Sequence, residues 1–179
     1  AVARIDQLEP TAPLNVRGRL SGPLANNLRV LQEEALQDRF GRFAAAVTGD
    51  GNTLLTLDFT VPLEDDDNDY ALAGRLVFDD NTLSLPDWDF RVSEVQGALD
   101  FTLDGLKAEG IAGQALGSPV TIDVAPASGG ATLISSRANL DVANLGLWLT
   151  MLPTHRMSGS ADFDIDITIP GTAAVESAR

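Results

Sequence analysis

The sequence predicts a mainly β protein: a long, curled antiparallel sheet that forms a groove, with two amphipathic helical segments packed on its apolar face or rim. Three observations lead to this fold class. Apolar and polar residues alternate over most of the chain, turn-forming residues separate the alternating stretches, and only two stretches show helical spacing. Strict alternation places apolar side chains on one face of a strand, as in an antiparallel sheet with one face in water.

The expected strands follow one another with short connections. The clearest are 53–61 and 161–169, and the same pattern gives strands near 14–21, 70–78, 82–93, 97–104, 106–112, 118–125 and 130–140. Residues that tolerate turn geometry predict tight turns at Asp79–Asn81 and Ala127–Gly130 and a hairpin at Asp104–Gly105. These connections predict a meander.

Two segments have apolar residues at steps of three and four, which is the spacing of an amphipathic helix. The first runs from 24 to 47, and we expect it to bend near Gly41 or to split near Gln37–Asp38. The second runs from 142 to 152, with Trp148 among the apolar residues of one face, and Pro153 would end it.

An internal repeat organises the chain. The stretches 51–62 and 159–170 align without a gap, each starts with Gly and ends with Pro, and each follows a strand and a helix. We therefore expect an N-terminal extension over 1–13, one β-groove segment over 14–172 in which 14–62 is related to 130–170, and a tail over 173–179. Repeats of one such unit predict an array that continues beyond the chain.

Charge and composition exclude several classes of function. The formal net charge is −14, so nucleic acid is not an expected partner, because its phosphates are bound mainly by Lys and Arg. There is no cysteine, which removes disulfides and thiolate sites. No apolar run approaches the roughly 20 residues of a membrane span, and no signal peptide is visible. Since the chain also lacks an initiator Met, we expect a processed protein or a piece of a longer one.

Candidate catalytic and metal-ligating residues are few. His155 is the single histidine and has no partner at a catalytic spacing. The acidic run 64–69 departs from the EF-hand pattern, because Tyr70 stands where that pattern needs Gly, so a solvated loop is the better interpretation. Asp162, Asp164 and Asp166 alternate along one strand and are expected on its wet face. The sequence therefore predicts no enzyme, no metal and no cofactor.

The remaining feature is the apolar face of the sheet, which two short helices have to cover. Either the sheet curls on itself or part of this face stays open. The expected inner face consists of Leu55, Leu57, Phe59, Val61, Leu72, Leu76, Phe78, Leu99, Phe101, Leu103, Phe163, Ile165, Ile167 and Ile169.

A family resemblance gives this face a function. LNVRGRLSGPLANNLRVL (14–31), LTLDFTVPL (55–63) and the ordered motifs of 71–124 resemble the AsmA-like envelope proteins of Gram-negative bacteria, specifically their YhdP-type branch. Those motifs are Gly74 to Phe78, Leu83 to Pro86, Val95 to Phe101, Gly105 to Ala108 and Leu116 to Ile122. Each motif alone is weakly diagnostic, but the order of the motifs over most of the chain is specific for this family.

The resemblance implies an internal segment of an inner-membrane-anchored protein that extends through the periplasm and carries phospholipid acyl chains along an apolar groove between the two membranes. Flanking repeats of the same parent chain and other envelope proteins would then be its partners. Two other hypotheses remain open. The segment is a scaffold that aids outer-membrane protein assembly by strand addition, or it is a hydrolase or sugar-binding domain, which the lack of convergent polar residues disfavours.

Overall fold

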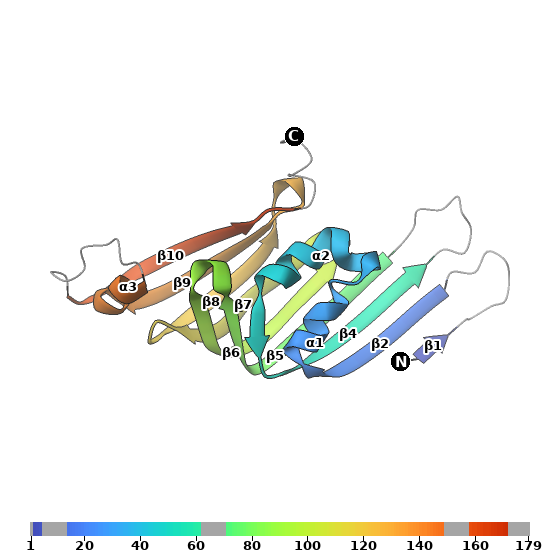
Figure 1. Cartoon of the computed structure of the whole chain (residues 1–179), viewed down its shortest axis with the longest axis horizontal. Helices are drawn as coiled ribbons and strands as arrows, with labels where there is room; N and C mark the ends of the chain where they lie inside the picture. Colours follow the sequence, from blue (N-terminus) through green and yellow to red (C-terminus); the bar gives the residue numbers. More distant parts are fainter. Residues whose placement is uncertain (1, 5–13, 62–70, 149–157, 172–179) are drawn as a thin grey trace.

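The computed structural model describes residues 2–4, 14–61, 71–148 and 158–171. In these residues the chain forms one antiparallel sheet of ten strands, with the α-helices gathered on one side of it (Figure 1). The strands are β1 (Val2–Arg4), β2 (Leu14–Pro23), β3 (Thr48–Asp50), β4 (Asn52–Val61), β5 (Ala71–Leu85), β6 (Phe90–Thr102), β7 (Gly105–Ala115), β8 (Ser118–Pro126), β9 (Thr132–Asp141) and β10 (Ser160–Ile169). The helices are α1 (Leu24–Val30), α2 (Glu34–Ala46) and α3 (Val142–Trp148).

The sheet is a meander in which almost every strand pairs with its neighbour in sequence. The order across the sheet is β1-β2-β4-β5-β6-β7-β8-β9-β10, and β3 pairs with the far end of β5. The edge strands β1 and β10 do not pair with each other within the described residues, so the sheet is open. It nevertheless curls: α2 contacts both β7 in the middle of the sheet and β10 at its edge, which a flat sheet would not allow. The predicted mainly β fold with a curled sheet is confirmed.

Both predicted helical segments are present, but the first one breaks at a different place. The chain leaves the helix at residues 31–33, where Leu31, Gln32 and Glu33 donate their backbone N–H groups to the carbonyl three residues earlier. Gly41 lies inside α2, and no break occurs at residues 37–38. The burial of Leu31, which is 1% exposed, fixes the turn between α1 and α2 on the sheet. In the second segment α3 is described up to Trp148, and Pro153 lies outside the described residues.

The prediction of a tight turn at Asp79–Asn81 is wrong, and so is the separate strand 82–93. The strand β5 runs through these residues with a β-bulge, and the chain reverses at the 3₁₀ turn Pro86–Trp88. The reason is the amide of Asn81, which is fully buried and donates hydrogen bonds to the carbonyls of Asp50 (3.1 Å) and Asn52 (3.2 Å). Asn81 therefore joins β5 to β3 and β4, and the turn-forming residues before it form a bulge instead.

The other expected connections are confirmed. Thr102 pairs with Gly105, which places a two-residue hairpin turn at residues 103–104. The segment 127–130 connects β8 to β9 and contains the 3₁₀ turn Ser128–Gly130. In both connections a glycine adopts a positive φ, 130° at Gly105 and 68° at Gly129, which a residue with a Cβ rarely does.

The helices α1 and α2 are fixed to the sheet by apolar packing and by a buried polar contact. The rings of Phe40 in α2 and Phe101 in β6 meet edge to face, with centroids 5.5 Å apart. The Phe101 ring covers Gly74 of the next strand so closely that a Cβ at Gly74 would collide with it. In α1 the buried amide of Asn27 donates to Oγ1 of Thr53 at 2.7 Å. These two helices therefore occupy the inside of the curl.

Candidate functional site

Apolar side chains form continuous rows across the concave face of the sheet. The Leu76 row begins with Leu55, Leu76 and Leu99 on β4 to β6 and continues with Ala108, Val124, Ile134 and Ile167 on β7 to β10. The Ile122 row lies beside it and contains Phe78, Ile111, Ile122, Ser136 and Ile165. Each row thus reaches from the region under α1 towards the edge strand β10.

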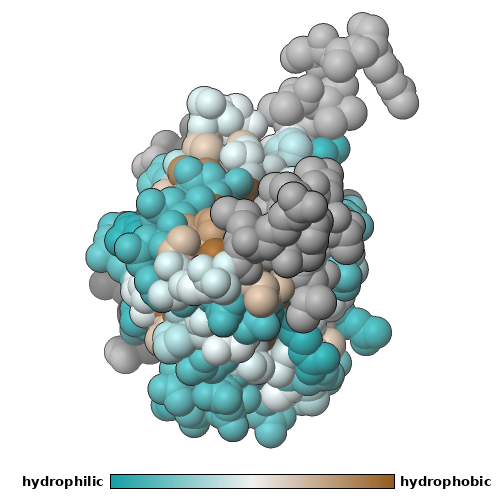
Figure 2. Space-filling model, turned by 90° about the vertical axis from the view of Figure 1, so that its left-hand side faces the viewer, coloured by the Kyte–Doolittle hydropathy of each residue, from teal (hydrophilic) through white to brown (hydrophobic). Residues whose placement is uncertain are grey.

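The two ends of these rows are covered differently. At the β4 to β6 end, Leu55, Leu76 and Phe101 are each 1% exposed and belong to the same core cluster as the buried residues of α1 and α2. We call this end the helix-covered region. At the other end, Ile122, Val124 and Ile167 are also buried, but Ile134 and Ile165 are only half-buried. Seen from the end of the molecule where α3 lies, the surface is mainly hydrophilic with a small hydrophobic area near its centre (Figure 2).

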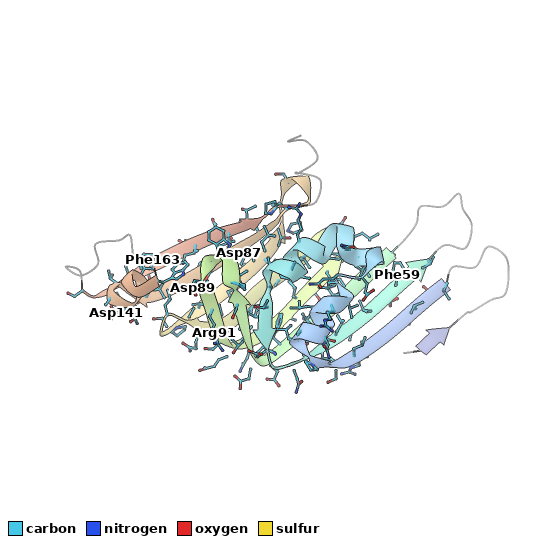
Figure 3. The ribbon with its side chains drawn as sticks, viewed as in Figure 1. Phe59, Asp87, Asp89, Arg91, Asp141 and Phe163 are labelled. Atoms are coloured by element: carbon cyan, nitrogen blue, oxygen red, sulfur yellow. The ribbon has the colours of Figure 1, made fainter. Side chains whose placement is uncertain are left out.

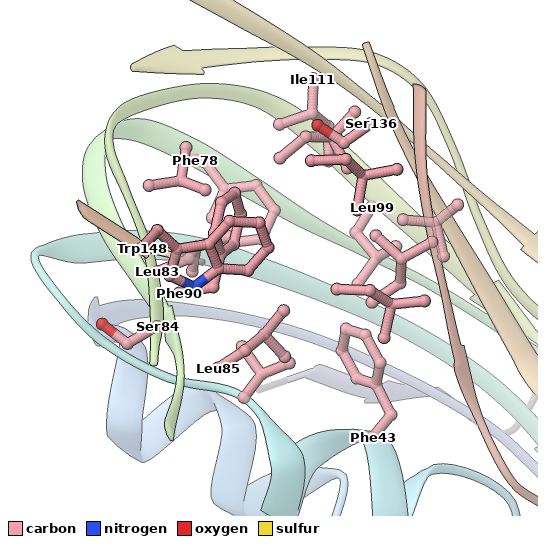
Figure 4. A pocket seen from close by; sticks show the side chains of 17 residues that line it. Phe43, Phe78, Leu83, Ser84, Leu85, Phe90, Leu99, Ile111, Ser136 and Trp148 are labelled. Atoms are coloured by element: carbon pink, nitrogen blue, oxygen red, sulfur yellow. The ribbon is translucent and has the colours of Figure 1, made fainter. Parts of the chain in front are cut away.

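A cavity of about 70 Å³, here called the apolar hollow, lies over the β7 to β10 end of the rows. Its floor consists of Ile111, Ile122, Val124, Ile134, Ser136, Ile165 and Ile167, joined by Phe78, Val92 and Leu99 from β5 and β6. Phe43 and Val47 at the end of α2 form one wall (Figure 4). None of its 17 lining residues is charged, and its open surface is made of carbon. Such a surface takes hydrocarbon and disfavours water.

At the hollow, the Ile122 row contains a small residue, Ser136. Ser136 lies between Ile122 on β8 and Ile165 on β10 in the strand register. Its side chain is 8% exposed and faces the hollow, whereas larger apolar side chains stand on either side. A short side chain in a row of branched ones leaves space that its neighbours do not fill.

The hairpin between β5 and β6 forms the remaining wall. Its arms contribute Leu83, Leu85 and Phe90, and Asp87 and Asp89 mark its tip between α2 and α3 (Figure 3). Trp148 of α3 packs against this hairpin, with its ring centroid 5.1 Å from that of Phe90. The same indole donates its Nε1–H to the backbone carbonyl of Trp88 at 2.9 Å.

Charged residues lie on the opposite, convex face. Arg75 pairs with Asp100 at 2.9 Å and Arg137 with Asp123 at 3.0 Å, across neighbouring strands. Lys107 binds Glu109 at 2.9 Å, and this hydrogen bond and the carboxylate charge raise the pKa of the Lys107 amine. The sheet therefore separates charged side chains on its outer face from the uncharged described residues that line the hollow.

The fourteen residues expected on the inner face fall into two groups by burial. Leu55, Leu72, Leu76, Phe78, Leu99, Phe101, Ile167 and Ile169 are buried, while Leu57, Phe59, Val61, Leu103, Phe163 and Ile165 are half-buried. Only Phe78, Leu99, Ile165 and Ile167 line the hollow. Phe59 and Phe163 stand at opposite ends of the molecule (Figure 3).

Sequence reasoning missed several residues of the hollow. The alternation of 118–125 identifies Val120, Ile122 and Val124 as apolar, yet the expected site omitted that strand. Ser136 gave no signal, because its significance depends on its neighbours in β8 and β10. Trp148 was expected on an apolar helix face, but its contact with the hairpin joins residues 60 positions apart.

The polar candidates form no catalytic or metal site in the part of the chain that the structure describes. Asp162, Asp164 and Asp166 are exposed on β10, as predicted, and Asp162 accepts a hydrogen bond from Asn139 at 2.7 Å. No group of three or more acidic, His or Cys side chains is arranged to hold a metal ion within the described ranges. His155 and the acidic run 64–69 lie outside them.

Two further observations bear on the class of protein. Among the described helices, none has the length and apolarity to cross a membrane. No curated protein and no solved structure matches the chain. The family model described as YhdP protein, by contrast, matches residues 1–177, which is nearly the whole chain, and links it to lipid transport in the cell envelope. The chain therefore belongs to the YhdP family.

Proposed function

We propose that this chain is a non-catalytic segment of a periplasmic, inner-membrane-anchored protein and that it conducts phospholipid acyl chains between the inner and outer membranes. The observation that carries the proposal is the apolar hollow, which continues the rows of apolar side chains and has no charged residue among the described residues that line it. A tail of about 14 methylenes costs on the order of 11 kcal/mol to expose to water, at about 0.8 kcal/mol for each methylene. An apolar surface lowers this barrier without any bond chemistry.

The acyl path runs over the β7 to β10 end of the rows rather than along the whole concave face. The helices α1 and α2 already cover Leu55, Leu76 and Phe101, which leaves no surface there for a lipid. Of the expected groove residues, Phe78, Leu99, Ile165 and Ile167 therefore serve the lipid, whereas Leu55, Leu76 and Phe101 hold the helices. The headgroup stays in water outside the hollow, because the hollow offers it no polar partner.

A cavity-filling substitution tests this assignment. Ser136→Leu replaces one hydroxyl by three carbon atoms inside the hollow, so we expect the variant to stay folded and to lose about tenfold or more of its affinity for cis-parinaric acid, a fluorescent fatty acid. Ser135→Leu is the matched control, because Ser135 neighbours it on the opposite face of β9 and lines no part of the hollow.

Fluorescence titration of both variants and of the unsubstituted chain gives the three affinities, and native mass spectrometry detects phospholipid that co-purifies with each. Equal affinity in the Ser136→Leu and Ser135→Leu variants would show that acyl chains do not use the hollow. Absence of binding by the unsubstituted chain, together with no co-purifying lipid, would remove the proposed function altogether.

The two repeat units of the chain, 14–62 and 130–170, share a structural detail, which supports the proposal that the chain is part of a longer array of such units. In the unit 14–62 the backbone N–H of Leu24, the first residue of α1, donates to the carbonyl of Gly51 at 2.9 Å. In the unit 130–170 the N–H of Val142, the first residue of α3, donates to the carbonyl of Gly159 at 3.0 Å. Both glycines have positive φ and occupy the same position in the sequence repeat. We infer that flanking repeats of the same parent chain adjoin this segment.

Strand addition is the second candidate function, and the edge strand β10 favours it. Within the described residues β10 pairs only with β9, over ten regular positions without a bulge. A regular edge of this kind can accept an additional strand. Pull-down of outer-membrane barrel precursors by the purified chain tests the scaffold role, and substitution of Ile165 by Pro, which interrupts the ladder at this edge, should abolish it.

A further inference from the structure

The two repeat units contain the same hairpin, paired in the same register. The ladders β2–β4 and β9–β10 each consist of ten consecutive pairs without a bulge. Each ladder begins at the residue after the repeat's glycine, where Asn52 pairs with Pro23 in the first unit and Ser160 pairs with Asp141 in the second. In the alignment of 51–62 with 159–170, β10 therefore takes the place of β4, residue by residue.

The strands β4 and β10 differ in their second neighbour. Beyond β2, β4 also pairs with β5 over eight positions, from Thr53 to Thr60. β10 forms the edge of the sheet and pairs only with β9 within the described residues (Figure 1). The side of β10 that corresponds to the β5 side of β4 is therefore open over the equivalent positions, 161–168.

The outward side chains along this open edge are acidic. Asp162, Asp164 and Asp166 are exposed, and the side chain of Asp164 is 84% exposed. The neighbouring strand β9 contains a single basic residue, Arg137, which lies 3.9 Å from Asp164 and closer, at 3.0 Å, to Asp123 on its other side. β9 therefore compensates little of the negative charge of β10.

The first unit compensates the same charge better. Asp58 on β4, the counterpart of Asp166, accepts an ion pair from Arg17 of β2 at 2.8 Å. In the second unit Asp166 faces Ser135 of β9 instead. Since opposite charges across neighbouring strands stabilise a sheet and like charges destabilise it, the carboxylates of β10 favour a basic strand on the open edge.

The strand β5 shows which residues such a strand presents at each position. In the register of β5 on β4, Arg75 stands opposite Thr56, and Thr56 corresponds to Asp164 in the repeat. The same register places apolar side chains of β5 beside the positions that Phe163 and Ile167 occupy on β10. A strand like β5 thus offers a cation where β10 has a carboxylate and apolar groups where β10 has apolar groups.

We propose that the open edge of β10 accepts a β5-like strand of a flanking repeat, in the register of β5 on β4 and with Lys or Arg opposite Asp164. The inference rests on the place of the chain in an array, which is part of the proposed function, and it names the chemistry of the adjoining strand. It differs from strand addition through backbone hydrogen bonds alone, which is indifferent to side-chain charge.

A synthetic peptide with the sequence of residues 71–78 tests the charge match, because β4 receives this stretch. In fluorescence anisotropy titrations, we expect Arg75→Glu in the labelled peptide to weaken its binding to the chain about two- to tenfold, since a like-charge pair replaces an opposite-charge pair. Asp164→Arg in the chain should restore the affinity for that peptide. Asp58→Arg is the matched control: it changes the net charge equally but lies on β4, whose two sides are filled, so it should restore nothing.

The register has its own measurement, because the chain contains no cysteine. In a glutathione buffer, Asp164→Cys should form a disulfide fastest with the peptide that carries Arg75→Cys, and Asp166→Cys with the peptide that carries Ala73→Cys. In the crossed combinations the two cysteines are offset by two positions along the strands, which is about 6–7 Å, so these should react more slowly.

Three results overturn the inference: equal affinity of the two peptides, no binding of either peptide, or equal rates for matched and crossed cysteine pairs. None of them affects the lipid test. If cis-parinaric acid binds and the peptide does not, the acyl site stands and the assignment of the edge is wrong. If the peptide binds in register while the chain binds neither cis-parinaric acid nor co-purifying phospholipid, the assignment of the edge stands and the acyl function fails.

Discussion

The helix-covered region and the apolar hollow are two ends of the same rows of side chains, and they differ in what lies above them. Over Leu55, Leu76 and Phe101 the chain places two consecutive helices, α1 and α2. Over Ile122, Ser136 and Ile165 it places the short helix α3 and a hairpin, with a cavity beneath them. The comparison teaches that the same alternation of apolar and polar residues can specify either a packed core or a partly open apolar surface, depending on which segments pack above the strand.

The lengths of those connecting segments account for the difference. Between β2 and β4 the chain has room for α1, α2 and β3, whereas the connection from β9 to β10 begins with α3 and is ten residues shorter, spanning 142–159 instead of 24–51. In the described part of the shorter connection, the seven-residue α3 reaches the hollow through Trp148.

The largest expected effect is a loss of unfolding free energy, and it should differ between the helix-covered region and the β10 end of the sheet. Phe101→Ala removes a fully buried ring that contacts Phe40, so we expect it to lower the free energy of unfolding by about 3–5 kcal/mol. Phe163→Ala removes the same atoms from a half-buried position on β10 and should cost about 1–2 kcal/mol. Urea unfolding followed by circular dichroism measures both. Equal losses would mean that the two ends are packed alike.

A smaller effect is expected at the polar contacts that fix the helices. Asn27→Ala breaks a buried hydrogen bond to Thr53 and leaves that hydroxyl without its partner, at a cost of about 1–3 kcal/mol. Asn144→Ala breaks the bond from α3 to the carbonyl of Leu116, which is only partly buried, and should cost less than about 1 kcal/mol.

Amide hydrogen exchange tests how far the effects of Asn27→Ala and Asn144→Ala spread through the structure. Asn27→Ala should increase exchange in both α1 and α2, whereas the effect of Asn144→Ala should stay within α3. If Asn144→Ala accelerates exchange throughout the sheet, α3 contributes more to the stability of the fold than the buried Leu145 suggests.

The smallest effect is expected on the convex face. The hydrogen bond and charge of Glu109 raise the pKa of Lys107, so their contribution to stability is present below the ordinary lysine pKa of about 10.4 and disappears as the pH rises through the raised value. Because both side chains are exposed, Glu109→Gln should leave the melting temperature at neutral pH unchanged within error. An NMR titration of the Lys107 side chain should show its pKa falling towards the ordinary value. A clear drop in melting temperature would contradict this.

Sequence periodicity predicts most of the sheet but not its irregular parts. Strict alternation locates the ends of strands such as β4 and β10 within a residue or two. The alternation arises because successive side chains of a strand point to opposite faces of the sheet. The bulge at Asp79–Asn81 resembles a turn in composition, and its true partners, the carbonyls of Asp50 and Asn52, lie about 30 positions earlier in the chain. A local pattern contains no information about such partners.

The same limit applies to the candidate site. The apolar character of the inner face follows from the alternation, and the family resemblance supplies its proposed use. The end of a row that becomes covered depends on where the helices pack on the sheet. The hollow depends on Ser136, which lies between two isoleucines of neighbouring strands. The contact of α3 with the β5–β6 hairpin includes a hydrogen bond between Trp148 and Trp88, which are 60 residues apart. None of these contacts is visible in a window of neighbouring residues.

The meander order of the sheet also has a consequence for how the chain acquires its structure. Nearly every strand pairs with the strand that precedes it, and no closing strand has to return from a distant part of the sequence. Short loops close at a low entropic cost, and topologies made of local pairings fold quickly. The sheet can therefore form strand by strand from the N-terminus as the chain is synthesised, with each new strand pairing with a strand that has already folded.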